Sequence, residues 1–166
     1  MKKIVFIFIF LISLVSCNQV HNDLNVYNGM TKNELLGNYK IKINDFHDLG
    51  ELVLVRFESS IYVVKFDRKN KVEDYDVLKI KNNIKKNREE YSKSLDKIDF
   101  YEALSTFGLP EDITKFQDSL EFALSFYINL EDCIGNKRTC LRISFRYEDE
   151  IYINTFNQYC EDYLII

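Results

Sequence analysis

Apolar residues occur in one nearly continuous stretch near the N-terminus and in shorter periodic groups over the rest of the chain. Residues 4–15 are apolar apart from Ser13, and a basic segment, residues 1–3, precedes them. A membrane-spanning helix needs about 20 apolar residues, so this stretch is too short for a comfortable span. Its length and its basic flank are typical of a signal peptide, which we predict over residues 1–16.

The chain beyond residue 28 begins with the pattern of a short capped helix. Thr31 and Glu34 have the spacing of a capping box, in which each side chain binds a backbone N–H at the start of a helix. Gly37 is placed to end this helix in a left-handed conformation. Because two turns of helix are not stable alone, we expect this helix to pack against another element.

Alternating apolar and polar residues then predict strands up to residue 80. We expect a short strand at 39–43 and a loop at 44–50. Asp74 and Asp76 are expected on the solvent side of the last strand. The three main strands are predicted at 51–57, 61–66 and 72–80.

A charged connector, residues 81–98, separates the two halves of the chain. Ile84, Tyr91 and Leu95 follow one another at helical spacing, which favours an amphipathic helix over part of the connector. A solvated linker is the alternative interpretation. Solvation explains the basic side chains here better than contact with anionic headgroups does, because neighbouring acidic residues dilute their charge.

The second half of the chain begins with another capped helix. Asp99 and Glu102 repeat the capping-box spacing, and the apolar stripe predicts a helix over 100–107. Gly108 follows this helix, and Pro110 prevents it from restarting.

The strongest period-two pattern of the chain lies at residues 120–130 and predicts a long strand with one face on a core. A turn at 133–139 follows it. The remaining elements are predicted as a returning strand at 140–147, a turn at 148–150, a last strand at 151–156 and a partly helical tail at 157–166.

These elements predict an α+β fold in which short helices pack on antiparallel sheet. A capped helix and about three strands occur in residues 29–80, and the same order returns in residues 99–166. This order is consistent with a tandem helix-plus-three-strand repeat. The chain beyond residue 16 has the length of one ordinary domain or of two small similar ones.

The end of the apolar stretch, residues 14–17 (Leu-Val-Ser-Cys), resembles the lipobox of bacterial lipoproteins. In that family the cysteine carries lipid on its sulfur and is the first mature residue, so the resemblance implies lipidation of Cys17, for example by palmitate. Stable anchoring takes about two acyl chains, which the lipid on such a cysteine supplies. Residues 17–28 would then form a polar, lipidated tether. Asn18 replaces the aspartate that marks inner-membrane retention in some enteric bacteria, which favours the outer membrane. An ordinary secretory signal and an uncleaved anchor are the alternatives.

A second resemblance concerns the two capped helices. Residues 29–32 (Gly-Met-Thr-Lys) and residues 103–110 (Ala-Leu-Ser-Thr-Phe-Gly-Leu-Pro) are similar to a motif of small outer-membrane lipoproteins. In that group a Gly-Met-Thr start, a short helix and a Leu-Gly-x-Pro stop precede an antiparallel sheet. The group includes the small lipoprotein subunit of the outer-membrane β-barrel assembly machine, and its fold is similar to that of the β-lactamase inhibitor protein. In this chain no Pro follows Gly37, and the Gly-x-Pro lies in the half without Gly-Met-Thr.

Composition and charge add one exclusion. The formal net charge is −4, and it becomes −6 when Lys2 and Lys3 are removed with the signal peptide. An acidic chain with an envelope address argues against nucleic-acid binding. The chain contains 13 Phe and 11 Tyr, which favour strands.

The cysteines suggest a disulfide. Cys17 is expected to carry lipid, and the compartment beyond the inner membrane is oxidising, so the other three can pair. Cys133 and Cys140 flank a predicted hairpin turn and are the favoured pair. Cys160 is then free or bonds to one of these two instead, and the spacing leaves this open.

No catalytic motif is present in the sequence. His47 lies between Asp45 and Asp48 and offers a weak candidate for a metal or proton-transfer site. Cys and His spacings typical of metal sites are missing, so we predict no metal and no cofactor. Acidic residues at 131–132 and 148–150 are better explained as solvated turns than as paired acids or calcium ligands.

We therefore expect a non-enzymatic binding or scaffold module that is anchored in the cell envelope through Cys17. Its exposed sheet face or loops would recognise another envelope protein. Arg142 and Arg146, on one face of the returning strand, are candidate contacts to an acidic partner. An inhibitor or immunity-type lipoprotein that neutralises a toxin or hydrolase is the alternative. An envelope enzyme is a third hypothesis, for which the sequence identifies no residues.

Overall fold

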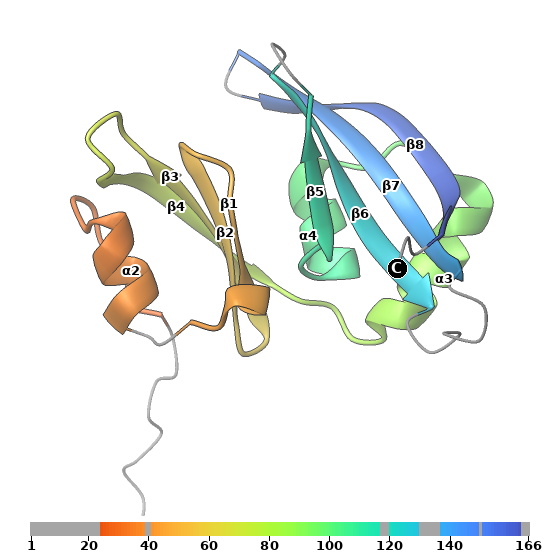
Figure 1. The fold of residues 1–166 in the computed structure, drawn as a ribbon, viewed down its shortest axis with the longest axis horizontal. Helices are drawn as coiled ribbons and strands as arrows, with labels where there is room; N and C mark the ends of the chain where they lie inside the picture. Colours follow the sequence, from red (N-terminus) through yellow and green to blue (C-terminus); the bar gives the residue numbers. More distant parts are fainter. Residues whose placement is uncertain (1–23, 39–40, 117–119, 130–136, 150, 164–166) are drawn as a thin grey trace, which may run out of the picture.

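Two sheets and several short helices make up the described part of the chain (Figure 1). The computed structural model describes residues 24–38, 41–116, 120–129, 137–149 and 151–163. The N-terminal sheet contains β1 (Phe46–Asp48), β2 (Leu52–Phe57), β3 (Ser60–Phe66) and β4 (Val72–Lys79). The C-terminal sheet contains β5 (Asp112–Lys115), β6 (Glu121–Asn129), β7 (Lys137–Glu148) and β8 (Ile151–Tyr163). The helices are α2 (Lys32–Asn38), the 3-10 helix η1 (Ile43–Asp45), α3 (Ile84–Ser94) and α4 (Phe100–Phe107).

Each sheet is an antiparallel meander in which every strand pairs with the next one along the chain. The strand orders are β1-β2-β3-β4 and β5-β6-β7-β8. The predicted α+β fold with short helices and antiparallel sheet is therefore confirmed. Each half contributes four strands instead of the three that the sequence suggests, because β1 and β5 add a short edge strand to each sheet.

Helices and sheets alternate as layers (Figure 1). Leu35 of α2 is buried against one face of the N-terminal sheet. A second core cluster joins Leu54 and Val63, on the opposite face of that sheet, to Phe107 of α4 and Ile143 of the C-terminal sheet. The layers therefore follow the order α2, N-terminal sheet, α4, C-terminal sheet, with α3 beside α4.

The segment before α2 holds this helix against the sheet. The predicted capping box is confirmed, because Thr31 N donates to Glu34 Oε2 at 2.7 Å and Glu34 N donates to Thr31 Oγ1 at 3.2 Å. Leu24 and Val26 are buried in the same core cluster, and Leu24 N donates to the Tyr62 hydroxyl at 2.9 Å. The prediction of a free tether is thus wrong for these two residues. Its earlier part lies outside the described residues.

The start and end of α4 agree with the sequence pattern. Asp99 accepts hydrogen bonds from the backbone N–H groups of Tyr101 and Glu102. Gly108 follows the helix with a φ of 81°, a conformation that residues with a side chain rarely adopt. A Cβ at this position would also lie 3.3 Å from Ile84, so glycine allows α3 to approach the end of α4.

A buried guanidinium, that of Arg88, joins α3 to α4 and β6. Arg88 donates to Phe107 O at 2.9 and 2.6 Å and to Tyr127 O at 2.7 Å, and it pairs with Glu111 at 2.7 Å. Phe107 is the last residue of α4, where a helix leaves its carbonyls without intrahelical partners. The predicted helix in the connector is confirmed, whereas the expectation that its basic side chains are solvated is wrong for Arg88.

Two predictions around the end of α2 are wrong. Gly37 lies inside α2 and does not adopt the left-handed conformation expected of a helix stop. In the predicted strand at 39–43, residues 41–42 are irregular and Ile43 begins η1, while residues 39–40 lie outside the described part. Polar residues around this stretch fit a 3-10 turn as well as a strand, so its pattern was ambiguous.

Two further segments are strands, although the sequence predicted a loop and a tail there. The predicted loop at 44–50 contains β1, because Phe46 pairs with Val55 and packs partly against the core. The predicted tail at 157–166 is strand up to Tyr163, since pairing with β7 continues to Lys137↔Tyr163. Both segments are edge strands with many polar residues, and hydrogen bonds to the neighbouring strand outweigh their weak apolar pattern.

Candidate functional site

The C-terminal sheet has one face that no helix of the described chain covers, which we call the open face. Side chains alternate between the faces of a strand, and Phe122, Leu124 and Ile143 all belong to the core on the other side. In Figure 1, α3 and α4 lie behind this sheet. The open face consists of Ala123, Ser125 and Tyr127 of β6, Arg142, Ser144 and Arg146 of β7, and Ile151, Ile153, Phe156 and Gln158 of β8.

The open face combines an apolar edge with a charged middle. Ile151, Ile153 and Phe156 of β8 have exposed fractions of 63%, 45% and 55%. On the neighbouring strand, Arg146 Nη1 lies 3.2 Å from Glu148 Oε1. Apolar side chains surrounded by polar ones are typical of surfaces that contact other proteins.

The open face also contains two buried serines, one of which contacts Arg142. Ser125 and Ser144 are only 1% and 6% exposed, although no described helix lies over them. Arg142 Nε lies 3.3 Å from Ser125 Oγ. Arg142 and Arg146, which the sequence singled out as one face of a strand, do lie together on the open face.

A disulfide closes one end of the open face. Cys140 of β7 and Cys160 of β8 are opposite each other in register and bonded, with their Cα atoms 5.2 Å apart. The favoured pairing of Cys133 with Cys140 is therefore wrong, and the pairing of Cys160 that the sequence left open is the one observed. The physical reason is the length of β8, which brings Cys160 beside Cys140. Cys17 and Cys133 lie outside the described residues.

A cleft with aromatic walls opens between the two sheets, and we call it the aromatic cleft. It consists of two adjoining cavities of about 440 and 140 Å³, which share Leu52, Lys65, Tyr147 and Tyr152 in their walls. Its aromatic residues are Tyr75, Tyr101, Phe116, Phe122, Tyr147 and Tyr152.

The rings of the aromatic cleft support one another. The Tyr152 ring centroid lies 4.9 Å from that of Tyr147 and 5.8 Å from that of Phe122. Burial raises the pKa of Tyr152 well above its usual range. Burial, and after it the negative charge of Asp76, raises the pKa of Tyr101 to about 12. These tyrosines therefore keep neutral hydroxyl groups at neutral pH.

Acidic groups dominate the rim of the aromatic cleft. Lys65 Nζ lies 3.2 Å from Glu73, and Lys115 Nζ bonds to a backbone carbonyl of the turn between β1 and β2, so the protein itself engages both lysines. Asp76 lies near the Tyr101 hydroxyl, in the wall of the same cavity. The charged residues that line the cleft are Glu51, Asp74, Asp76 and Glu121, against Lys65 and Lys115. Four carboxylates and two ammonium groups give a net charge of −2.

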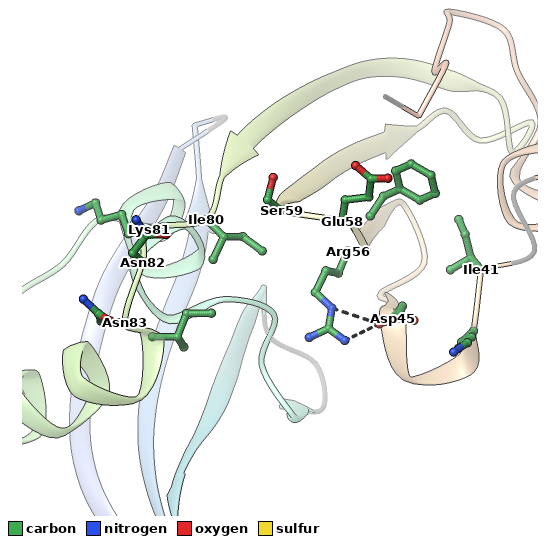
Figure 2. A pocket seen from close by; sticks show the side chains of 12 residues that line it. Ile41, Asp45, Arg56, Glu58, Ser59, Ile80, Lys81, Asn82 and Asn83 are labelled. Atoms are coloured by element: carbon green, nitrogen blue, oxygen red, sulfur yellow. Dashed lines mark hydrogen bonds and ion pairs between the residues drawn. The ribbon is translucent and has the colours of Figure 1, made fainter. Parts of the chain in front are cut away.

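A third cavity, of about 680 Å³, lies where the N-terminal sheet meets the connector. Figure 2 shows Arg56 and Asp45 on one wall and residues 80–83 on the other. Arg56 donates to Asp45 Oδ1 from Nη2 at 2.5 Å and from Nε at 3.1 Å, so its guanidinium already has a partner. The other charged side chains in the walls include both Lys42 and Glu58, and the cavity therefore favours no class of ligand.

The candidate site around His47 is not assembled. His47 Nε2 lies 2.7 Å from Pro110 O. Asp45 is bound to the arginine of the third cavity, and Asp48 accepts a hydrogen bond from Lys32 Nζ at 2.9 Å. The three side chains thus have separate partners. Within the described residues, no three metal-ligating side chains lie close enough together to hold an ion.

The acidic segments are turns where they are described. Glu148 ends β7, and Asp149 adopts a φ of 47° in the turn to β8, with both side chains exposed. This agrees with the solvated turn that the sequence predicts. The acidic residues at 131–132 and residue 150 lie outside the described part.

Comparisons with known proteins identify no relative of this chain. No family model, curated protein or solved structure matches it. None of the helices in the described ranges is long and apolar enough to cross a membrane. The open face and the aromatic cleft are therefore judged on their own geometry and chemistry.

The sequence revealed these two surfaces only in part. Alternation placed the arginines of β7 on one face, and the same rule applied to Ile151 and Ile153 would have found the apolar edge of β8. The aromatic cleft has no local signal, because α4 and at least two strands of each sheet contribute to its walls. Tyr147 and Tyr152 are partners on adjacent strands, whereas Tyr101 comes from α4 and the opposite wall from the N-terminal sheet.

Proposed function

We propose that this protein is a lipid-anchored binding module of the bacterial cell envelope and that it contacts a partner protein through the open face. The observation that carries the proposal is the exposure of Ile151, Ile153 and Phe156 on a sheet whose opposite face is core. Removing such side chains from water on contact with a partner is favourable, by about 25 cal/mol for each Å² of apolar surface.

The polar part of the open face supports a partner that binds after folding. Arg142, Arg146 and Glu148 lie on β7 beside the apolar edge and provide charged residues at the border of a non-obligate interface. Guanidinium groups also suit recognition of carboxylates, so we expect acidic residues on the partner.

The proposed anchor is lipid on Cys17. It is supported by the resemblance of residues 14–17 to a lipobox and by the basic, apolar segment before them. The Cys140–Cys160 disulfide also supports an address outside the cytosol, because disulfides persist in oxidising compartments. Asn18 makes the outer membrane the proposed location.

The partner is tested by affinity capture from detergent-solubilised envelopes. Ile153→Asp places a charge on the open face, while Val77→Asp makes the same change at a 47% exposed residue of β4 in the other sheet. We expect the wild type and Val77→Asp to retain the same partner and Ile153→Asp to lose it. Equal capture by all three proteins would contradict the assignment of the open face. Capture of a secreted toxin or hydrolase, in place of an envelope subunit, would identify the inhibitor or immunity-type function.

The anchor is tested separately by Cys17→Ala. This variant should lose metabolic labelling by a fatty acid and leave the membrane fraction, because the thioether-linked lipid can no longer form. Persistent labelling would exclude lipidation at this residue.

A further inference from the structure

The aromatic cleft is a second recognition surface, distinct from the open face. Phe122 and Tyr152 line it from the core side of the C-terminal sheet, whereas the open face lies on the opposite side. We propose that this cleft binds a lysine or arginine side chain of a basic peptide segment. The proposal does not depend on the lipid anchor or on the partner of the open face.

The rings provide the first part of this recognition. Tyr147 and Tyr152 are tilted by 45° to each other, and Tyr101 is inclined by 69° to Tyr152 at 6.4 Å. All three rings line the smaller cavity. A cation is attracted to the face of an aromatic ring, and the attraction grows as water is excluded. The aliphatic stem of the side chain has apolar contacts available on Leu52 and on Phe116, which is 44% exposed.

The charges provide the second part. The cleft has a net charge of −2, and its two lysines are engaged within the protein, as described above. Asp76 lies beside Tyr101 in the wall of the smaller cavity, and Asp74 lies on the same side of β4 two residues away. An anionic ligand would be repelled by this charge, whereas a cationic one would be attracted to it.

The volume of the cleft limits the size of the ligand that it can bind. The cavity of about 440 Å³ lies in the lower part of the range of small-ligand sites, and the adjoining cavity of about 140 Å³ lies below that range. They accommodate one or two side chains and a short length of backbone, and they are too small for a folded domain. A basic peptide segment therefore fits both the volume and the charge.

The test is titration calorimetry of the detergent-solubilised full-length protein with N-acetyl tetra-arginine amide at low ionic strength. We expect saturable binding, which Asp74→Asn/Asp76→Asn weakens about tenfold because two counter-charges are lost. Tyr147→Leu should weaken it about fivefold, whereas Tyr147→Phe keeps the ring face and the affinity. The matched control is Glu89→Gln/Glu90→Gln, the same change of net charge at exposed residues of α3 outside the cleft.

Several outcomes would overturn the proposal. One is an equal loss of affinity in the α3 control, which would mean non-specific attraction to an acidic protein. Another is binding of N-acetyl tetraglutamate amide or of chitotriose with similar or higher affinity. A third is a Tyr147→Leu variant that binds as the wild type does, because the ring faces would then have no part in binding. The melting temperature of each variant establishes that it is folded, and the Tyr147 pair provides the test if the double asparagine variant is unstable.

Discussion

The two sheets share one construction and differ in what covers their second face. α2 packs on the first face of the N-terminal sheet, and α4 packs on the corresponding face of the C-terminal sheet. The second face of the N-terminal sheet lies against α4, whereas the second face of the C-terminal sheet is the open face. Within the described residues, the stack of helix and sheet layers ends with this sheet and leaves its last face uncovered, as the terminal unit of a repeat array does.

The side chains on these two second faces differ as their surroundings do. Leu54, Ile61 and Val63 of the N-terminal sheet are buried against α4. The equivalent central strands of the C-terminal sheet carry Ser125 and Arg142 there. This face of the C-terminal sheet thus carries polar residues, and packing among the described residues does not involve the apolar edge of β8. An apolar edge without a packing role is the feature that most favours a contact with another molecule.

We expect the largest change in the free energy of unfolding when a charged residue typical of the open face replaces an apolar residue of a covered face. Val63→Arg puts a guanidinium between β3 and α4, where Val63 is buried. An unpaired buried charge should lower the free energy of unfolding by more than about 3 kcal/mol and leave little folded protein. Urea denaturation followed by circular dichroism measures this loss. Arg142→Val is the reverse change on the open face and should alter stability by less than about 1 kcal/mol. Similar losses in both variants would show that the two faces are not different environments.

We expect the second-largest change in the free energy of unfolding on removal of the disulfide. The described residues of the N-terminal sheet contain no such bond. Cys140→Ala/Cys160→Ala should lower the free energy of unfolding by about 3 kcal/mol, because 20 residues separate the joined cysteines. Native-state hydrogen exchange should show the loss of protection first in the second half of β8. Amides of β2 and β3 serve as the internal control. If they lose protection as early as β8 does, the disulfide acts on the whole stack and not on the open sheet alone.

How much of the fold was predictable depended on the strength of local patterns. The sequence correctly predicted β6 from the alternation at residues 120–130, and it predicted the starts of α2 and α4 from the capping pairs at Thr31 and Asp99. At these places local propensity and apolar pattern favour the same structure. β1 and the second half of β8 were missed, since an edge strand with polar side chains has no clear period. The burial of Leu24 was missed because its contacts are distant in sequence, and its backbone N–H donates to the hydroxyl of Tyr62, 38 residues away.

Features that depend on strand register or on contacts between helices and sheets could not be predicted from the sequence. The choice of Cys160 over Cys133 follows from the pairing of β7 with β8, and the spacing of the cysteines does not contain it. Arg88 looked like one more basic residue of a charged connector, but the end of α4 and Glu111 provide it with buried partners. The open face was partly predictable from alternation, whereas the aromatic cleft exists only once the two sheets are packed.

A smaller effect is expected at the apolar edge of the open face. Ile153→Asp should change the free energy of unfolding by less than about 0.5 kcal/mol, because Ile153 is already 45% exposed on an edge strand. Urea denaturation of this variant beside Leu35→Ala, which removes a buried α2 side chain and should cost about 3 kcal/mol, gives a direct comparison of the two ends of the stack. A loss above about 2 kcal/mol for Ile153→Asp would make this residue part of the core. Failed capture by the variant would then report misfolding and not a lost contact.

We expect the smallest effect on stability at the start of α2, which is the outermost layer beside the N-terminal sheet. The hydrogen bond from the Thr31 backbone, followed by that from its hydroxyl, lowers the pKa of Glu34 below its usual value. A group whose pKa is lower in the folded state stabilises that state fully above its unfolded pKa, and this contribution disappears as the pH falls through the folded pKa. Acid should therefore weaken the start of α2, which packs Leu35 against the N-terminal sheet.

An NMR titration should show the chemical shifts of the Glu34 carboxyl and the Thr31 amide changing together, with a midpoint below pH 4.5. Glu34→Gln keeps a hydrogen-bonding side chain without a titratable group, so its Thr31 amide should not respond in this range. A midpoint at or above 4.5, or a Thr31 amide that does not follow Glu34, would mean that the covered face does not depend on this capping box.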